Sequence, residues 1–518
     1  MTHDEYVARD ATGLAALVRA REVTPEELLD LALARVRKLD PTLNAVVRLM
    51  EDDARAAARE TARRLAAESA GASGDRGGSR GGVLVGVPFL AKDLVSTYAG
   101  HPTSAGSRYL ADLPAARDSE LAIRVKAAGL SVFGKTNLPE WGLLPTTEPR
   151  FFGPTRNPWD TGRTPGGSSG GAGAAVAAGI VPMAGGGDGG GSIRIPASCC
   201  GLFGLKPTRG RTPTGPDRGQ LWRGATVEHV LTRSVRDSAA MLDATHGPDP
   251  GAPYEIPPPA RPFGDEVDAD PGRLRIAWTT KPCVPVDVDP ECVAAVHEAV
   301  ALLRELGHEP IEAELPVDGP TFSRNFLTVV SGELGAEIEA AEARIGRPPR
   351  RGELEPATRA LALLAGALSA REFASALQGL ELTGRAIGRF FVDYDLVLTP
   401  TLSTPPPPLG TLGTSASEDR LLRLLGLFGS GRLIRLARVI DQAAESALDF
   451  TPFTPIFNVT GHPAMSVPLH WTPSELPVGV HIVARFARED VLFRVAGQLE
   501  RARPWFDRLP ELARESPE

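Results

Sequence analysis

Cysteine is scarce in this 518-residue chain, which holds only Cys199, Cys200, Cys283 and Cys292. Four cysteines in so long a chain make no disulfide framework, and none stands in the CxxC spacing of a zinc site. The sequence therefore predicts reduced, apolar cysteines in a reducing compartment and no metal site.

An excess of positive charge and long apolar runs are also missing. The net charge of −8 argues against a nucleic-acid partner, because such binding depends on neutralising phosphates. No apolar run approaches the roughly 18 residues of a membrane span, and the N-terminus, MTHDEYVARD, lacks the basic and apolar regions of a secretion signal. We expect a soluble, cytoplasmic protein without a membrane span.

The remaining composition is that of a folded globular protein. Length alone allows several domains, but large α/β folds can run as one unit. Short β-type runs such as GVLVGVPFLAKDLV alternate with helical stretches such as DSELAIRVKAAG, which predicts an α/β sheet covered by helices. We predict a single domain over residues 1–518. It would comprise N-terminal helices at about 1–70, a Gly/Ser/Arg loop at about 69–82, a core at about 83–245, a variable region at about 246–450 and a return to the core at about 451–510.

Local signals place several elements. Thr24, with Glu27 three residues later, predicts the start of a helix that Pro41 would stop. Glycine and proline are dense between Gly153 and Gly215, where ordinary helices and strands would avoid them. The Leu/Arg-rich segment at about 420–440 predicts a helical hairpin, with a substrate lid or an interfacial helix as alternatives.

Two glycine motifs suggest nucleotide binding, and their context argues against it. Gly129 to Thr136, GLSVFGKT, satisfies the phosphate-loop pattern, but its middle residues look like a strand and Pro139 interrupts the helix that should follow. GGGDGG, with Gly185, Gly187 and Gly190, matches the dinucleotide pattern, but it follows PMA rather than a clear strand.

A third motif is a more serious competitor. GGSSG, Gly166 to Gly170, matches the nucleophile elbow of α/β-hydrolases. The residues before it, RTPGG, make a poor strand. The elbow would also need a late histidine, for which His462, His470 and His481 are available.

Two glycine clusters centred on serines suggest an acyl-transfer site. One surrounds Ser168 and Ser169, and the other, GGGDGGGSIRIPAS, contains Ser192. The unshielded backbone amides of Gly189, Gly190 and Gly191 can converge on one oxygen, as an oxyanion hole requires. Ser192 is therefore the better candidate nucleophile, although glycines beside serines also make plain turns.

Lys92 is the candidate base. It ends the apolar run of GVPFLAK, where a lone lysine usually reaches out to solvent. Burial could lower its pKa by about 3 units from its usual ~10.4, at a cost on the order of 4 kcal/mol. A neutral Lys92 could then accept the Ser192 proton through the Ser168 hydroxyl.

The chain resembles the amidase-signature family over almost its whole length, in motifs that include GVPFLAKDL, GKTNLPEWG, GGSSGG, D-GGGSIRIPA, CGLFGLKPTRG, FNVTGHPAMSVP and PVGVHIVAR. The resemblance implies an α/β fold with a twisted mixed sheet of about eleven strands, helices on both faces and no cofactor. It implies a triad of Lys92, Ser168 and Ser192, with a cis peptide before Ser168. It also implies an oxyanion hole from the backbone of 189–192 and supporting roles for Asp188, Arg194 and Ser169.

The resemblance implies amide hydrolysis through an acyl-enzyme, with a small-molecule amide as partner and a homodimer as one allowed assembly. Where many family members have threonine on either side of the motif aspartate, this chain has Gly187 and Gly189, and the loop would lose hydroxyls and rigidity. TTEP, TRNPW and IPASCCGLFGLKPTRGR are similar to bacterial hydrolases of linear or cyclic ω-amino-acid amides, such as the 6-aminohexanoate cyclic dimer hydrolases. Two rivals stay open, a subunit of a tRNA-dependent amidotransferase and a non-catalytic binding protein on the same fold.

Overall fold

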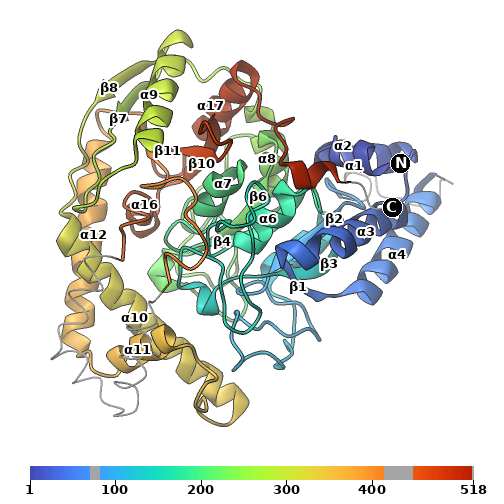
Figure 1. Ribbon diagram of the computed structural model, residues 1–518, viewed down its shortest axis with the longest axis horizontal. Helices are drawn as coiled ribbons and strands as arrows, with labels where there is room; N and C mark the ends of the chain where they lie inside the picture. The colour runs from blue at the N-terminus through green and yellow to red at the C-terminus, as the bar shows by residue number, and fades with distance from the viewer. Residues whose placement is uncertain (70–81, 414–446, 516–518) are drawn as a thin grey trace.

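An eleven-stranded mixed β-sheet runs through the middle of the protein (Figure 1). The computed structural model describes residues 1–69, 82–413 and 447–515. The strand order is β1-β3-β2-β4-β6-β5-β10-β11-β9-β7-β8, which confirms the prediction of a mixed sheet of about eleven strands. The strands are β1 (Val46–Leu49), β2 (Pro88–Lys92), β3 (Ser131–Thr136), β4 (Met183–Asp188), β5 (Phe203–Lys206), β6 (Val227–Thr232), β7 (Arg275–Trp278), β8 (Glu309–Glu312), β9 (Leu396–Pro400), β10 (Ala464–Trp471) and β11 (Pro477–Ala484).

Parallel pairing is confined to two parts of the sheet. β2 pairs in parallel with β3 and β4, and β7 pairs in parallel with β8 and β9. The strands between them are antiparallel, and the late strands β10 and β11 insert between β5 and β9. The last part of the chain therefore completes the centre of the sheet.

Helices cover both faces of the sheet, as predicted. The larger helices are α1 (His3–Val7), α2 (Ala11–Ala20), α3 (Pro25–Leu43), α4 (Glu51–Ser69), α5 (Glu120–Ala127), α6 (Gly170–Ala177), α7 (Arg194–Cys200), α8 (Val235–Thr245), α9 (Pro290–Glu305), α10 (Gly319–Ile345), α11 (Pro356–Ala365), α12 (Ala370–Phe390), α16 (Thr454–Val459) and α17 (Glu489–Ala502). Side-chain alternation along β11 separates the two faces. Val480 and Ile482 join the core under α8, α9 and α17, whereas His481 between them contacts Arg194 of α7.

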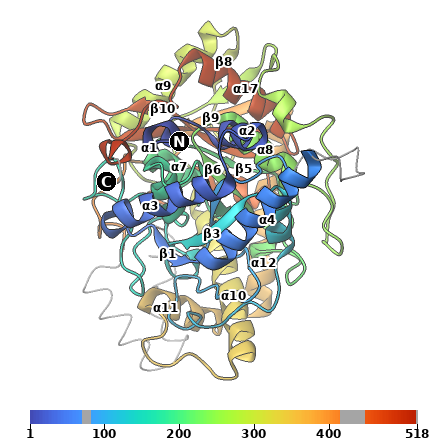
Figure 2. The ribbon, with the colours of Figure 1, turned by 90° about the vertical axis from the view of Figure 1, so that its right-hand side faces the viewer.

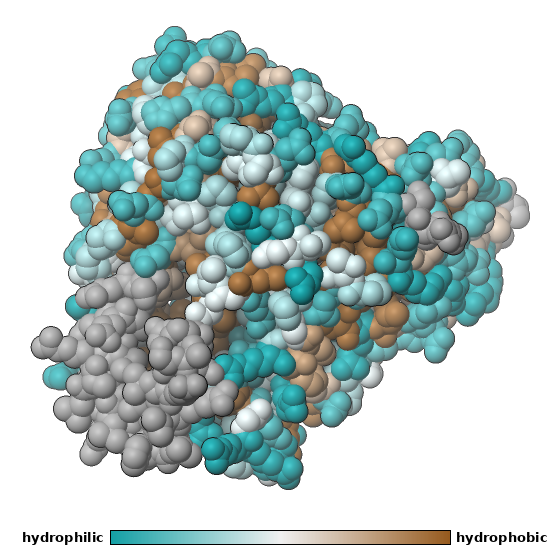
Figure 3. Space-filling model, in the orientation of Figure 1, coloured by the Kyte–Doolittle hydropathy of each residue, from teal (hydrophilic) through white to brown (hydrophobic). Residues whose placement is uncertain are grey.

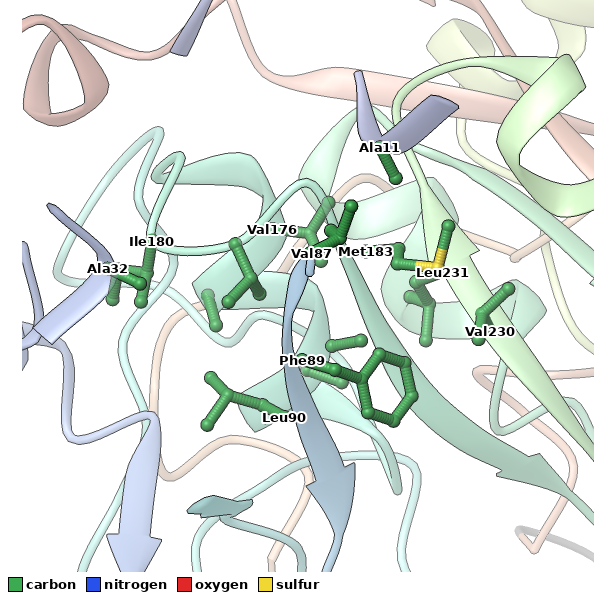
Figure 4. Packing of buried hydrophobic residues seen from close by; sticks show 14 of the residues in the cluster. Ala11, Ala32, Val87, Phe89, Leu90, Val176, Ile180, Met183, Val230 and Leu231 are labelled. Carbon is green, nitrogen blue, oxygen red and sulfur yellow. The ribbon is translucent and has the colours of Figure 1, made fainter. Parts of the chain in front are cut away.

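The N-terminal helices cover the β1 end of the sheet, where α3 and α4 pack on β3 (Figure 2). Figure 4 shows this part of the core, which contains Leu90 of β2, Val176 of α6 and Met183 of β4. These side chains are completely buried. The core beside β2 therefore holds the end of that strand, and with it Lys92, in place.

The helix predicted from Thr24 is present, but its predicted end is wrong. Thr24 and Glu27 form the expected capping box at the start of α3. Pro41 lies inside the helix, which continues to Leu43 and ends at Asn44 in the left-handed conformation. A proline this close to the end removes one backbone hydrogen bond, and the complete burial of Leu43 favours the extra residues.

The glycine-rich region is more regular than its composition indicates. α6, β4, α7 and β5 all lie between Gly153 and Gly215, although ordinary helices and strands avoid glycine and proline. The glycines permit close packing instead: a Cβ on Gly171 would lie 2.5 Å from the backbone N of Asn137, and one on Gly204 would lie 2.6 Å from the Cβ of Ala197.

The face in Figure 3 is largely hydrophilic, with small scattered hydrophobic patches. Within the described ranges, no single helix is long and apolar enough to cross a membrane, and α11 and α12 meet that test only as a pair bent by 105°. The Leu/Arg-rich segment at about 420–440 and most of the loop at 69–82 lie outside the described residues.

Candidate active site

The loop that carries Ser192 joins the end of β4 at Asp188 to the start of α7 at Arg194. Gly191 in this loop has φ +126°, a conformation that side chains rarely adopt. A Cβ there would also lie only 2.3 Å from Thr454 Oγ1. The loop conformation therefore requires glycine at this position.

A buried ion pair holds the two ends of the loop together. Arg194 Nη2 and Nε lie 2.9 and 3.0 Å from the two carboxylate oxygens of Asp188, and both side chains are completely buried. The amides of Gly191 and Ile193 donate to the same carboxylate at 2.7 and 3.1 Å. Burial alone would raise the pKa of Asp188, but the Arg194 guanidinium outweighs it and holds that pKa well below its usual range.

Helix α16 fixes the loop from the other side. Asn458 Nδ2 donates to the backbone and side-chain oxygens of Asp188, each at 2.8 Å, and its Oδ1 accepts from Arg194 at 2.6 Å. Thr454 Oγ1 donates to the carbonyl of Gly190 at 2.8 Å. The sequence singled out the FNVTGHP motif but not these roles, because only the fold brings the motif to the loop.

Lys92 lies at the end of β2 and is 1% exposed. Its Nζ is 2.8 Å from Ser168 Oγ and 3.1 Å from the carbonyl oxygen of Gly187. Burial lowers the pKa of Lys92, while the carboxylates of Glu228 and Asp188 oppose that shift. The structure thus brings the candidate base and the candidate relay into contact.

The second serine cluster meets the loop through its backbone. The Gly167–Ser168 peptide is cis, as the resemblance implies. The next amide, that of Ser169, donates to the carbonyl of Ser192 at 3.3 Å. Ser169 Oγ lies 3.3 Å from both the N and the O of Gly187, so it ties this cluster to β4.

Ser192 is the most accessible of the three candidate catalytic residues, at 9% exposure against 2% for Ser168. In the described part of the chain, the amides of Gly189, Gly190 and Ser192 have no hydrogen-bond acceptor. The amide of Gly191 already donates to Asp188. Three of the four predicted oxyanion donors are therefore free to bind a developing negative charge.

Neighbouring side chains fill the space left by the two unusual glycines. A Cβ on Gly187 would lie 1.9 Å from Glu228 Oε1, and one on Gly189 would lie 2.6 Å from Thr226 Oγ1 and 3.1 Å from the Trp222 ring. Glu228, Thr226 and Trp222 thus occupy the space that side chains at positions 187 and 189 would need. Glu228 and Trp222 were missed by sequence reasoning, because no motif marks them.

Apolar side chains lie close to the loop that carries Ser192. Phe326 of α10 and Pro455 of α16 are the nearest groups to a Cβ built on Gly190, at 3.6 and 4.0 Å. Together with the Trp222 ring beside Gly189, they form an apolar wall against the glycines that precede Ser192. Such a wall suits methylene or aryl groups of a substrate.

The nucleotide-binding alternatives do not match the structure. The phosphate-loop pattern lies in β3, where the buried Lys135 donates to Pro102 O and Thr103 Oγ1, each at 2.7 Å, and pairs with Asp93 at 3.2 Å. The dinucleotide pattern begins inside β4, so the view that no clear strand is present there is wrong. β4 nevertheless pairs antiparallel with β6, unlike the strand of a dinucleotide-binding βαβ unit.

The nucleophile-elbow alternative lacks its strand and its histidine. No strand leads directly into Gly166, and the partner of the Ser168 hydroxyl is Lys92 instead of a histidine. Each candidate histidine has other partners: His462 contacts Thr460, His470 contacts Glu291, and His481 contacts Arg194 and Thr399.

Gly191→Ala should damage this site. The substitution forces a side chain into the positive-φ position and against Thr454, and we expect a cost of about 1–3 kcal/mol in unfolding free energy and at least a tenfold loss of kcat. Gly190→Ala is the matched control, because its nearest neighbour lies 3.6 Å away. Thermal unfolding and amide turnover of both variants test this, and equal behaviour of the two would contradict it.

Comparisons with known proteins all indicate the amidase family, over nearly the full chain. The profile described as Amidase matches residues 27–493. The chain is 38% identical to the 6-aminohexanoate-cyclic-dimer hydrolase of Pseudomonas sp. (strain NK87), with 97% of each chain covered. A solved 6-aminohexanoate cyclic dimer hydrolase complexed with substrate aligns with a TM-score of 0.86 at 36% identity, covering 98% of this chain and 99% of that one. A bacterial aryl acylamidase of the amidase-signature family aligns with a TM-score of 0.83 at 27% identity, covering 98% and 99%.

Proposed function

Because this chain belongs to the amidase family and is therefore a hydrolase of amide C–N bonds, we propose that it acts on linear or cyclic ω-amino-acid amides with Ser192 as nucleophile, Ser168 as relay and Lys92 as base. The observation that carries the assignment of residues is the 2.8 Å contact between Lys92 Nζ and Ser168 Oγ inside the core.

The first half-reaction forms an acyl-enzyme. Ser192 Oγ attacks the amide carbon, its proton passes to Ser168 Oγ, and the Ser168 proton passes to Lys92 Nζ. The amides of Gly189, Gly190 and Ser192 bind the oxyanion. Lys92 then returns the proton through Ser168 to the departing amine as the C–N bond breaks.

The second half-reaction releases the acid. Water attacks the Ser192 ester, and the same relay takes up the water proton and returns it to Ser192 Oγ. Asp188 and Arg194 act by holding the loop, and Ser169 by holding the cis peptide against β4.

The substrate class rests on two observations. The relatives at 38% and 36% identity are named for the cyclic dimer of 6-aminohexanoate, and the wall formed by Trp222, Phe326 and Pro455 suits a methylene chain. The test is hydrolysis of a panel containing this cyclic dimer, linear 6-aminohexanoate amides, anilides and glutamine by the purified chain. Turnover of glutamine alone, and only with a second protein, would favour the amidotransferase alternative instead.

We further propose that the chain works in the cytoplasm as one domain, as a monomer or homodimer with a small-molecule amide as its partner. Support comes from its four free cysteines and from the sheet that joins its early and late strands. Size measurement of the active species tests the assembly.

The pH dependence of kcat/KM should report Lys92. The base must be uncharged to accept a proton, and burial lowers its pKa from the ordinary 10.5. We therefore expect kcat/KM to rise with pH along a limb whose midpoint lies below 10.5. A profile measured between pH 5 and 11 tests this, and a midpoint at or above 10.5 would contradict a buried lysine base.

A further inference from the structure

A small cavity lies beside Lys92, the proposed base. Lys92, Glu228 and His229 line it together with Ser96 and Tyr98, and we call it the Lys92 chamber. The cavity volume is about 20 Å³, measured as the space available to the centre of a water molecule, and this is enough for one water. Helices α5 and α8 close the chamber with apolar side chains, including Met241.

The chamber contains polar atoms that need a hydrogen-bond partner. Glu228 Oε1 and His229 Nδ1 are buried and have none among the described residues. Buried polar groups are nearly always paired with protein or with ordered water. A polar cavity of this size with unpaired acceptors is therefore suited to hold a water molecule.

Lys92 has one N–H to offer to this chamber. A lysine ammonium has three donors, and the described partners of Lys92 Nζ are two, Ser168 Oγ and Gly187 O. The third N–H is therefore available to a water molecule in the cavity, which both Lys92 and Glu228 line.

The chain makes room for the Glu228 carboxyl group by omitting a side chain. An added Cβ at Gly187 would stand 1.9 Å from Glu228 Oε1. With Glu228 in this conformation, position 187 cannot hold a residue larger than glycine. The unusual glycine before Asp188 and the buried glutamate thus form one structural unit.

We propose that Glu228 is a positioning partner of Lys92, linked to it through a water molecule bound in the Lys92 chamber. Its carboxylate stabilises the ammonium that forms when Lys92 takes the serine proton, and no bond to Glu228 is made or broken. The inference rests on the proposed role of Lys92 as base. A carboxylate next to a catalytic base is a familiar way to orient it and to stabilise its charged form.

The charges around the pair are consistent with this role. Burial dominates both groups, lowering the pKa of Lys92 and raising that of Glu228, and each opposes the shift of the other. The other titratable groups that face the pair are Asp188 from β4, His229 from β6 and Tyr98 from the segment after β2. The nearby faces of α5 and α8 contribute no charge to the chamber.

The test is the pH dependence of Ser192 phosphonylation by a fluorophosphonate probe, which needs no knowledge of the natural substrate. In Glu228→Gln, the Lys92 ammonium loses its negative partner, so we expect the acidic limb to move to lower pH by about 1 unit. The plateau rate should fall by up to about tenfold, because one unit of base strength corresponds to that factor. Glu228→Ala should shift the limb in the same direction.

Two controls separate this role from a structural one. Glu228→Asp keeps the charge and should return the limb toward its wild-type position. Glu309→Gln, which removes an exposed carboxylate on β8, should leave the profile unchanged. A limb that stays in place in Glu228→Gln and Glu228→Ala, with only the rate reduced, overturns the proposal. Failure of the wild-type protein to label at Ser192 would instead contradict the proposed nucleophile, so the two failures are distinguishable.

Discussion

Ser192→Ala should lower kcat for amide hydrolysis by roughly 10⁴–10⁶-fold, because it removes the atom that we propose as the nucleophile. The fold should be retained, since the hydroxyl of Ser192, a residue with 9% exposure, makes no hydrogen bond within residues 1–69, 82–413 and 447–515. Steady-state turnover of a cleaved amide, together with thermal unfolding, measures both effects.

Labelling gives an independent readout of the same prediction. A fluorophosphonate should modify Ser192 in the wild-type protein and leave Ser192→Ala unlabelled, with the site mapped by mass spectrometry. Ser169→Ala is the matched control, because its hydroxyl contacts the backbone of Gly187 and its loss should cost no more than about tenfold in kcat. A label on Ser168, or full turnover by Ser192→Ala, would exclude Ser192 as nucleophile.

Asp188→Asn should lower the free energy of unfolding by about 3–5 kcal/mol, because it leaves the Arg194 charge buried without its partner. The loop amides also lose a charged acceptor, so kcat should fall as well. The pH dependence follows from the lowered pKa of Asp188. Its stabilising contribution is present above the pKa of the unfolded carboxyl and is lost as the pH falls toward the folded value. The variant should lack this dependence.

An exposed ion pair provides the control for this second prediction. Arg273 and Glu309 are joined at 3.2 Å, with their side chains 73% and 43% exposed. Arg273→Ala should therefore cost less than about 1 kcal/mol. Chemical denaturation of both variants measures the difference. Equal losses would show that the Asp188–Arg194 pair does not hold the loop.

The sequence was sufficient to predict the fold class and to single out Lys92 and Ser168, which the structure brings into contact. Glycine clusters and a lysine at the end of an apolar run are local signals, and in the structure Lys92 and Ser168 are in contact. The resemblance added the strand number and the cis peptide, neither of which has a local signal. Pro41 shows the limit of local rules, because packing of Leu43 extends the helix past it.

The parts that could not be predicted depend on long-range contacts. Asn458 lies 270 positions from Asp188 and reaches it only because β10 and β11 return to the centre of the sheet. Glu228 and Gly187 face each other across the β4–β6 pair, and neither residue alone indicates the other. Strand pairing therefore creates the environment of the site, whereas local motifs supply its reactive groups.

The position of α16 has a consequence for protein synthesis. The serines and the lysine have all been translated once residue 192 is made, but Thr454 and Asn458, which hold the nucleophile loop, come more than 250 residues later. A ribosome-bound chain that carries all three candidate catalytic residues thus still lacks the contacts that hold the loop with Ser192. The loop that carries Ser192 should consequently reach its final conformation only after residue 458 has been translated and α16 has formed.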